Sequence, residues 1–233
     1  MSDQESALIV GAGVGLSASL ARLFASQGMK VALTARNTDK LSELASETGA
    51  MTAKCDVGDA ASVDAMWAEV KEGIGVPNIV VYNPSYRVRG PFVELNRDEV
   101  QKAIMISCYG GFLVAQVAAT DMLKRGSGTI EFTGASASIK GYPQSASFAM
   151  GKFGLRGLAQ SMARELVPQN IHVAHFVIDG GIKKAGNDPR GEGKPEDALL
   201  EPDAIAQSYL NLHRQHRSAW SWELELRPWV EKF

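Results

Sequence analysis

Short apolar runs alternate along the chain with longer segments in which apolar residues recur at helical spacing. Residues 7–10 form the first run, and Leu16, Leu20 and Phe24 follow it on one helix face. Similar runs occur at residues 31–34, 50–55, 79–82, 129–132 and 171–178, and residues 222–227 alternate apolar and polar side chains as an edge strand does. Strands that alternate with helices form a parallel sheet covered on both faces. The pattern predicts a doubly wound α/β fold with a parallel sheet of about seven strands.

The 233 residues are enough for one domain of this type. No internal repeat or second domain is visible, so we predict a single domain over residues 1–233. Residues 183–202 are rich in charge, glycine and proline, but a strand still follows them. We therefore predict that this segment is a mobile lid within the domain rather than a linker.

The charge balance argues against two classes of partner. Lys and Arg number 24 against 26 Asp and Glu, a net charge of -2, so no positive field recruits nucleic acid or an anionic membrane. The polar, acidic start does not look like a signal peptide, and no window offers the ~20 apolar residues of a spanning helix. Cys55 and Cys108 lie far apart, outside any metal-binding spacing. We predict a cytoplasmic protein without a metal site that binds small molecules.

A glycine-rich turn, residues 11–17, joins the first predicted strand to the first helix with the sequence GAGVGLS. The backbone N–H groups of such a turn and the helix N-terminus can hold a pyrophosphate. A glycine cluster alone could be only a tight turn, but its place in an alternating strand–helix pattern favours dinucleotide binding, as in a Rossmann fold. We predict that Gly11, Gly15 and Leu16 bind the cofactor.

The chain resembles the short-chain dehydrogenase/reductase superfamily, in its single-domain form, over nearly its whole length. Gly11 and Gly15 match the first two glycines of the family turn TGxxxGxG, whereas Val10 replaces its Thr and Ser17 its last glycine. The resemblance implies an oligomer, a homodimer or homotetramer, built partly on the two long helices.

Further cofactor contacts are implied by the same resemblance. Asp56 and Val57 look like the family's adenine-contacting Asp-Val pair, and Asn83 matches the second Asn of its NNAG turn. Asp56 is also the kind of residue that caps the end of a strand, so both interpretations remain open.

The end of the second predicted strand distinguishes between the two nicotinamide cofactors. An NAD-binding protein has an acidic residue there for the ribose 2′-hydroxyl, whereas this chain has Ala35 followed by Arg36. A guanidinium can pair with a 2′-phosphate. We therefore predict a preference for NADP(H) over NAD(H); the alternative is that Arg36 only faces solvent.

The family reduces carbonyls or oxidises alcohols with a Tyr-x-x-x-Lys pair on one helix, a Ser before it and an Asn on the preceding helix. In this chain Phe148 stands at the Tyr position, Ala135 at the Ser position and Ser107 at the Asn position, and only Lys152 remains. None of the 5 tyrosines is followed by a lysine four residues later. The chain therefore resembles an atypical subgroup with an imperfect glycine motif and Phe in place of Tyr.

Another acid could replace the missing tyrosine. Tyr142, in the loop before the helix, and Ser136 or Ser138 are candidates, although each could be an ordinary loop residue. Lys152 could still hold the ribose hydroxyls of the cofactor, or its ammonium could extend to water beside Phe148.

These residues predict an NADP(H)-dependent oxidoreductase of a small carbonyl or alcohol, with Lys152, Tyr142 and Ser136 as catalytic residues. The alternative from another class is an NADP(H)-binding sensor or partner subunit without turnover, and a lyase that uses Lys152 is a third possibility. Trp220, Trp222 and Trp229, near the C-terminus, could cover the substrate cleft, form a subunit interface or simply be buried.

Overall fold

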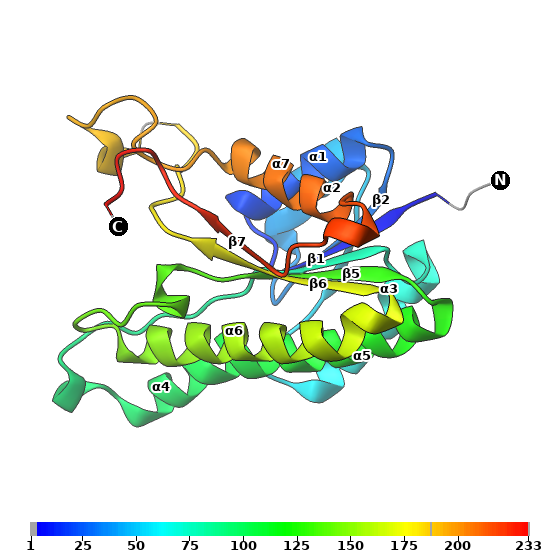
Figure 1. Ribbon diagram of the computed structural model, residues 1–233, viewed down its shortest axis with the longest axis horizontal. Coiled ribbons are helices and arrows are strands. Elements are labelled where there is room, and N and C mark those ends of the chain that lie inside the picture. Colours follow the sequence, from blue (N-terminus) through cyan, green and yellow to red (C-terminus); the bar gives the residue numbers. More distant parts are fainter. Residues whose placement is uncertain (1–3, 187, 233) are drawn as a thin grey trace.

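The computed structural model describes residues 4–186 and 188–232. Its sheet has seven parallel strands in the order β3-β2-β1-β4-β5-β6-β7 (Figure 1). The strands are β1 (Ser6–Val10), β2 (Lys30–Ala35), β3 (Met51–Lys54), β4 (Ile79–Tyr82), β5 (Gly128–Thr133), β6 (Ile171–Ile178) and β7 (Glu223–Leu226). The strand order reverses between β1 and β4, where folds of this type bind their ligands. The predicted doubly wound fold is confirmed, including the edge position of β7.

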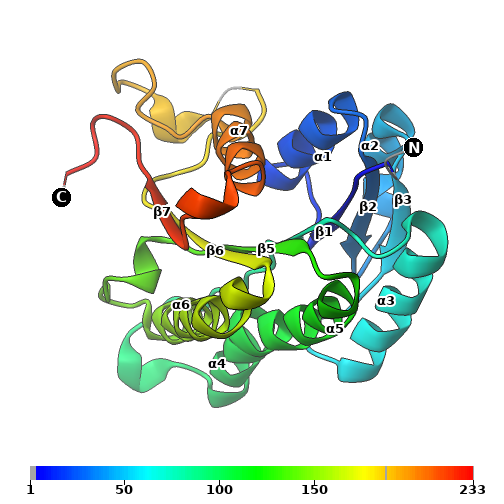
Figure 2. The ribbon, with the colours of Figure 1, turned by 45° about the vertical axis from the view of Figure 1, so that its right-hand side comes forward.

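Helices cover both faces of the sheet (Figure 2). One apolar core lies between the sheet and α3, α5 and α6, and the other lies between the sheet and α1, α2 and α7. The α-helices are α1 (Leu16–Ser26), α2 (Ser42–Thr48), α3 (Ala60–Ile74), α4 (Arg97–Ile104), α5 (Gly110–Arg125), α6 (Ala146–Leu166) and α7 (Pro202–His213). The strands are almost continuously apolar because both of their faces are buried in this way.

One π-helical turn, Met105–Tyr109, lies between α4 and α5 and joins them into one long helical span. Gly110 and Gly111 follow this turn and allow close packing: a Cβ atom on Gly110 would lie 2.6 Å from the Val57 carbonyl oxygen, and one on Gly111 2.6 Å from Leu155. The span Arg97–Arg125 is long and apolar enough to cross a membrane by length and composition. Half of its apolar window is buried against the rest of the domain, as in the core helix of a globular protein.

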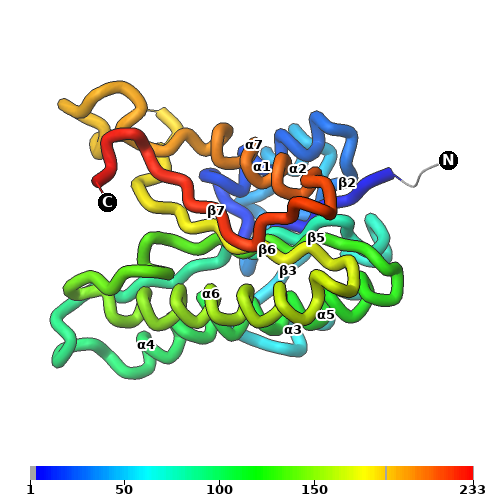
Figure 3. The backbone as a smooth tube through the Cα atoms, viewed as in Figure 1, coloured from blue at the N-terminus to red at the C-terminus, as the bar shows by residue number. Residues whose placement is uncertain are grey.

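The segment 183–202 follows β6 and leads into α7. Its ends are joined by a parallel bridge between Ile182 and Leu200, and a short 3₁₀ turn spans Pro189–Gly191. The indole nitrogen of Trp229 donates a 3.0 Å hydrogen bond to the Glu196 carbonyl, so the C-terminal stretch runs beside this segment (Figure 3). Residue 187 lies outside the described residues, and the mobility of the segment stays a prediction.

Candidate functional site

A cleft of ≈ 560 Å³ opens at the carboxyl ends of β1, β2, β3 and β4. It is lined by residues 11–14, 35–37, 40, 55–57, 83–86 and 106. Five of the predicted cofactor residues are therefore brought together: Gly11, Arg36, Asp56, Val57 and Asn83. Gly15 and Leu16 come directly after the lining turn, where α1 begins.

The glycine turn has the shape of a phosphate cradle. Gly11 has φ +76°, and its N–H group donates a 3.0 Å hydrogen bond to the Thr34 carbonyl oxygen. A Cβ atom at Gly11 would lie 2.7 Å from the ring of Pro84, whereas Cβ atoms at Gly13 and Gly15 would meet nothing within 4 Å. No side chain caps the first turn of α1. Open space above two glycines and an uncapped helix N-terminus are what a pyrophosphate needs, so the turn fits the cofactor.

Ser17, which stands where the family has its last glycine, connects the turn to β4. Its hydroxyl donates to the Gly11 carbonyl oxygen at 3.3 Å and accepts a 2.8 Å hydrogen bond from the Asn83 amide. The Ser17 hydroxyl therefore links the glycine turn to Asn83 by hydrogen bonds, which a glycine at this position would not do.

Two cations lie at the end of β2. Arg36 was expected there, and the structure adds Lys40, four residues later in the short 3₁₀ helix Asp39–Leu41. Neither side chain forms an ion pair with any of the described residues. Sequence reasoning missed Lys40, although a second cation four residues after Arg36, close to the end of the same strand, was a usable signal.

Asp56 fits both interpretations of its role. Its carboxylate accepts a 3.0 Å hydrogen bond from the Gly58 N–H group, as expected of a residue that caps the end of a strand. Asp56 also lines the cleft, as expected of a cofactor contact. The predicted contact with adenine stays a prediction.

Lys152 is buried in α6, with 2 % of its surface exposed. Its ammonium donates a 2.7 Å hydrogen bond to the Thr133 carbonyl oxygen, and it lies 5.9 Å from the centre of the Phe148 ring. Burial lowers the pKa of Lys152 to about 8. The Thr133 carbonyl oxygen holds the ammonium inside the protein. The alternative that the Lys152 ammonium extends to water beside Phe148 is therefore wrong.

Comparison with known proteins identifies the family. The family model for short-chain dehydrogenases matches residues 5–190. The chain belongs to this family. It is 30% identical over 177 residues, 76% of this chain and 69% of the relative, to the 3-oxoacyl-(acyl-carrier-protein) reductase MabA of Mycobacterium tuberculosis.

Solved structures of other family members agree with the fold. A short-chain dehydrogenase from Rhodopseudomonas palustris has a TM-score of 0.81 and 34% identity, covering 96% of this chain and 99% of that one. An alcohol dehydrogenase from the archaeon Thermococcus sibiricus, complexed with 5-hydroxy-NADP, has a TM-score of 0.86 and 24% identity, covering 98% of each chain. The cleft described above lies at the carboxyl ends of the strands, where open α/β sheets bind their ligands.

Ser107, predicted above at the family's Asn position, lies in the π-helical turn and is fully buried. Its hydroxyl accepts a 3.3 Å hydrogen bond from the Tyr86 N–H group and donates to the Tyr86 carbonyl oxygen at 3.4 Å. π-helical turns are frequent at functional sites, and this one fixes the loop that follows β4.

The proposed replacements for the tyrosine are not gathered around the cleft. Tyr142 is 42% exposed, and neither its hydroxyl nor that of Ser136 hydrogen-bonds to any of the described residues. Ser138 is buried and accepts a 3.1 Å hydrogen bond from the Ala135 N–H group, so its hydroxyl is engaged in the turn after β5. Neither Tyr142 nor Ser136 lines the cleft volume, and their catalytic roles stay predictions.

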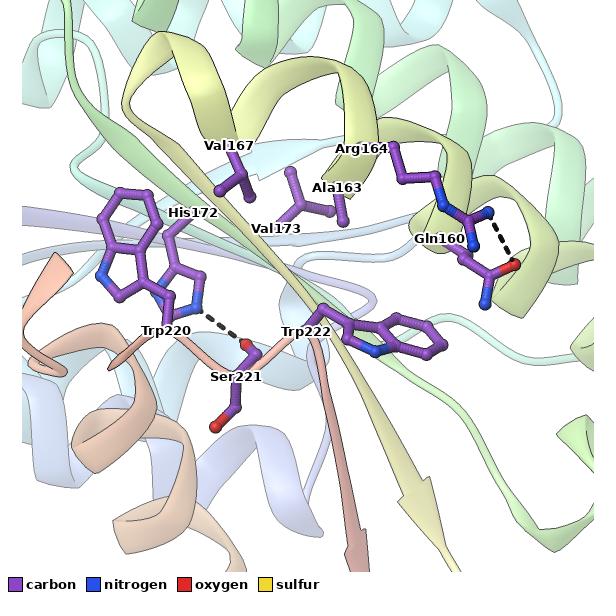
Figure 4. A pocket seen from close by; sticks show the side chains of 9 residues that line it. All are labelled: Gln160, Ala163, Arg164, Val167, His172, Val173, Trp220, Ser221 and Trp222. Carbon is purple, nitrogen blue, oxygen red and sulfur yellow. Dashed lines mark hydrogen bonds between the residues drawn. The ribbon is translucent and has the colours of Figure 1, made fainter. Parts of the chain in front are cut away.

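A second pocket of ≈ 230 Å³ lies at the opposite edge of the sheet, beside the beginning of β6 (Figure 4). Trp220 stacks on His172, with ring centres 4.5 Å apart, and Trp222 forms another part of the wall. Because these two tryptophans precede β7, they lie at the amino ends of the strands. The idea that Trp220 and Trp222 cover the substrate cleft is therefore wrong, whereas Trp229 follows β7 and its role stays a prediction.

Proposed function

We propose that this short-chain dehydrogenase is an NADP(H)-dependent oxidoreductase that interconverts a small carbonyl compound and an alcohol without the family tyrosine, as a member of the Phe-for-Tyr subgroup. The pair of cations at the end of β2 carries the cofactor preference. Arg36 and Lys40 line the cleft without a carboxylate partner among the described residues. A 2′-phosphate supplies the charge that they lack, and the archaeal relative of the same fold binds an NADP analogue.

The remaining residues divide the work of the site. When bound, the nicotinamide cofactor supplies a hydride to the carbonyl carbon, and the carbonyl oxygen must take up one proton to give the alcohol. The glycine turn and the N-terminus of α1 hold the pyrophosphate, and Asn83 keeps the turn closed through Ser17. We propose that Lys152, which is not among the residues that line the cleft, holds ribose hydroxyls, and its pKa of about 8 makes its ammonium an acid of suitable strength near neutral pH.

We propose that the proton donor is Lys152, Tyr142 or Ser136. General acid catalysis contributes a factor of about 10² to 10⁴ in rate. Loss of the tyrosine therefore slows the chemical step without removing the hydride transfer that proximity and orientation support. Phe148, which is half-buried, has no hydroxyl and so offers this part of the site no proton.

The segment 183–202 is proposed to act as a lid on this cleft. It leaves β6 at the carboxyl ends of the strands, which is the edge where the cleft opens. A loop in that position can exclude water when substrate binds.

A homodimer is proposed to form through the outer faces of α5 and α6 and the π-helical turn. Five large apolar side chains are exposed on these elements: Tyr109, Phe112, Leu123, Met150 and Phe153. The rings of Tyr109 and Phe112 stack with centres 5.9 Å apart. Exposed apolar patches of this kind on a helix pair are typical of subunit interfaces.

A sensor or partner subunit is the second candidate, favoured by the three substituted positions Ser107, Ala135 and Phe148. Titration of the protein with NADPH and NADH, followed by a carbonyl panel with loss of the reduced cofactor as readout, separates the two. Tight NADPH binding with consumption supports the oxidoreductase. Tight binding without consumption supports the sensor, and failure to bind either nucleotide contradicts both.

A further inference from the structure

The ring of Phe148 is bordered by two cations. The guanidinium carbon of Arg87 lies 4.8 Å from its centre, and the ammonium nitrogen of Lys152 lies 5.9 Å from it. Arg87 belongs to the loop after β4 and directly follows Tyr86, which lines the cofactor cleft. The guanidinium therefore lies over Phe148, the residue at the family's tyrosine position, and is next to the cleft in sequence, although Arg87 itself is not among the residues that line the cleft.

The loop that carries Arg87 is fastened to the start of α6. A guanidinium nitrogen of Arg87 donates a 2.9 Å hydrogen bond to the Ser145 hydroxyl, which is fully buried. The Ser147 hydroxyl donates to the Val88 carbonyl oxygen at 2.8 Å and accepts from the Val88 N–H group at 3.3 Å. One hydrogen bond and a ring contact thus hold the guanidinium, and two further hydrogen bonds hold the backbone of the next residue, whereas an arginine that merely solubilises a loop needs none of them.

The local electrostatics is positive and uncompensated. Neither Arg87 nor Arg89 makes an ion pair with any residue in the described ranges. Ser145 is the N-cap of α6, and no acidic residue lies in the first turn of that helix. Because the N-terminus of a helix carries partial positive charge, a guanidinium there is repelled rather than stabilised. Partial burial and the neighbouring Arg89 lower the pKa of Arg87, which reflects the same surplus of positive charge.

We propose that Arg87, assisted by Arg89, binds an anionic group of the substrate, so that this enzyme acts on carbonyl compounds that carry a carboxylate or a phosphate. The proposal rests on the oxidoreductase function proposed above and names its substrate class. Arg87 uses only one of its donor groups within the protein, so a planar pair of N–H donors remains available for a bidentate contact with an anion. The Phe148 ring, 4.8 Å from the guanidinium carbon, covers one side of the guanidinium.

Paired substrates that differ only in charge test the proposal. Succinic semialdehyde is compared with its methyl ester, and glyceraldehyde 3-phosphate with glyceraldehyde, each with NADPH. The ratio of kcat/KM for the anionic over the neutral member should be at least about tenfold for the unaltered protein. Arg87→Gln should lower that ratio by about tenfold to a hundredfold. Arg164→Gln, which removes the same charge beside the pocket at the opposite sheet edge, should not change it.

A binding measurement separates this proposal from the proposed function. Calorimetric titration of the NADP-loaded protein with succinate and with dimethyl succinate reports anion recognition without turnover. Stronger binding of succinate that is lost in Arg87→Gln supports the proposal even where no carbonyl is reduced, in which case only the oxidoreductase function fails. Thermal unfolding of each variant verifies that it is folded, and Arg87→Lys provides a second, charge-conserving variant with an intermediate effect.

Two results would overturn the proposal: no preference for anions in either assay, or a loss of that preference in Arg164→Gln equal to the loss in Arg87→Gln. The comparison of the carboxylate with the phosphate substrates shows which anion is preferred.

Discussion

The ammonium group of Lys152 donates a 2.7 Å hydrogen bond to the carbonyl oxygen of Thr133, deep between α6 and the end of β5. In this apolar setting the charged form of the side chain is penalised, and its pKa falls from 10.5 to about 8. The protein therefore keeps a destabilising charge next to the ring of Phe148. Such a loss of stability is common where a residue serves function.

Replacement of Lys152 by methionine is expected to stabilise the protein at neutral pH. The folded pKa lies below the unfolded one, so the lysine disfavours folding below about pH 8, and this disadvantage disappears as the pH rises toward 10.5. From the pKa difference, Lys152→Met should raise the free energy of unfolding by roughly 2–3 kcal/mol at pH 7. Chemical denaturation at pH 7 and at pH 9.5 checks this, with a smaller gain expected at the higher pH. A destabilised variant at both values would show that the hydrogen bond to Thr133 outweighs desolvation.

The cofactor preference should depend on both cations at the end of β2. Arg36→Ala and Lys40→Ala are each expected to weaken NADPH binding by about tenfold, because each removes one charge-assisted contact to the 2′-phosphate. NADH binding should change little. Fluorescence titration with both nucleotides measures the ratio, and Lys124→Ala, on the exposed end of α5, serves as a charge-matched control. An unchanged ratio in the Arg36→Ala, Lys40→Ala double variant would mean that these cations face only solvent.

Phe148→Tyr restores a Tyr-x-x-x-Lys pair on one face of α6. The ring is already within 5.9 Å of the Lys152 ammonium, so the new hydroxyl gains the neighbour that lowers its pKa in the family. We expect kcat for carbonyl reduction to rise by about tenfold, below the full range for general acid catalysis because Ala135 and Ser107 remain. Steady-state kinetics with NADPH measures it, and Phe153→Tyr, on the exposed face of the same helix, is the matched control. Equal changes in the two variants would contradict the proposed geometry.

A buried carboxyl in the sheet makes a prediction about pH and stability. Glu131 in β5 is fully buried, neither of its oxygens has a hydrogen-bond partner among the described residues, and desolvation holds its pKa well above the usual range. With its folded pKa above its unfolded value, its contribution to stability is largest below about pH 4.5 and is lost as the pH rises. The gain in unfolding free energy of Glu131→Gln over the parent should therefore grow between pH 5 and pH 8 by up to about 1.4 kcal/mol per unit. Parallel stability curves would show that a partner satisfies the carboxylate.

The apolar face of α5 and α6 predicts an assembly. Phe153→Glu places a charge in the middle of the exposed apolar side chains and should convert a dimer into monomers. Analytical ultracentrifugation of the variant and the parent at equal concentration is the check. A parent that sediments as a monomer, or a variant that still assembles, would mean that this face is not the contact.

Much of the fold follows from local patterns. Continuously apolar strands and the alternation with helices predict the parallel sheet, because strand residues are buried whichever face they point to. Ile9 is buried in the core on one face and Val80 in the core on the other. The glycine turn and Arg36 can also be predicted from the sequence, since their roles depend on the backbone and charge near one position. The sequence does not predict three other features: the π-helical turn at Ser107, the hydrogen bond from Lys152 to Thr133 and the contact of Arg87 with the Phe148 ring. They depend on contacts between elements far apart in the chain, which no short sequence window contains.

Transfer of deuterium from NADPH labelled at the nicotinamide C4 position tests the central claim most directly. The protein is incubated with each stereoisomer of the labelled cofactor and with the anionic and neutral carbonyl compounds above, and the products are analysed by mass spectrometry. The account predicts an alcohol that carries one deuterium from only one of the two stereoisomers. Tight binding of NADPH with no labelled alcohol from any of these carbonyl compounds would contradict it, and would identify the protein as a cofactor-binding member of the family without redox turnover.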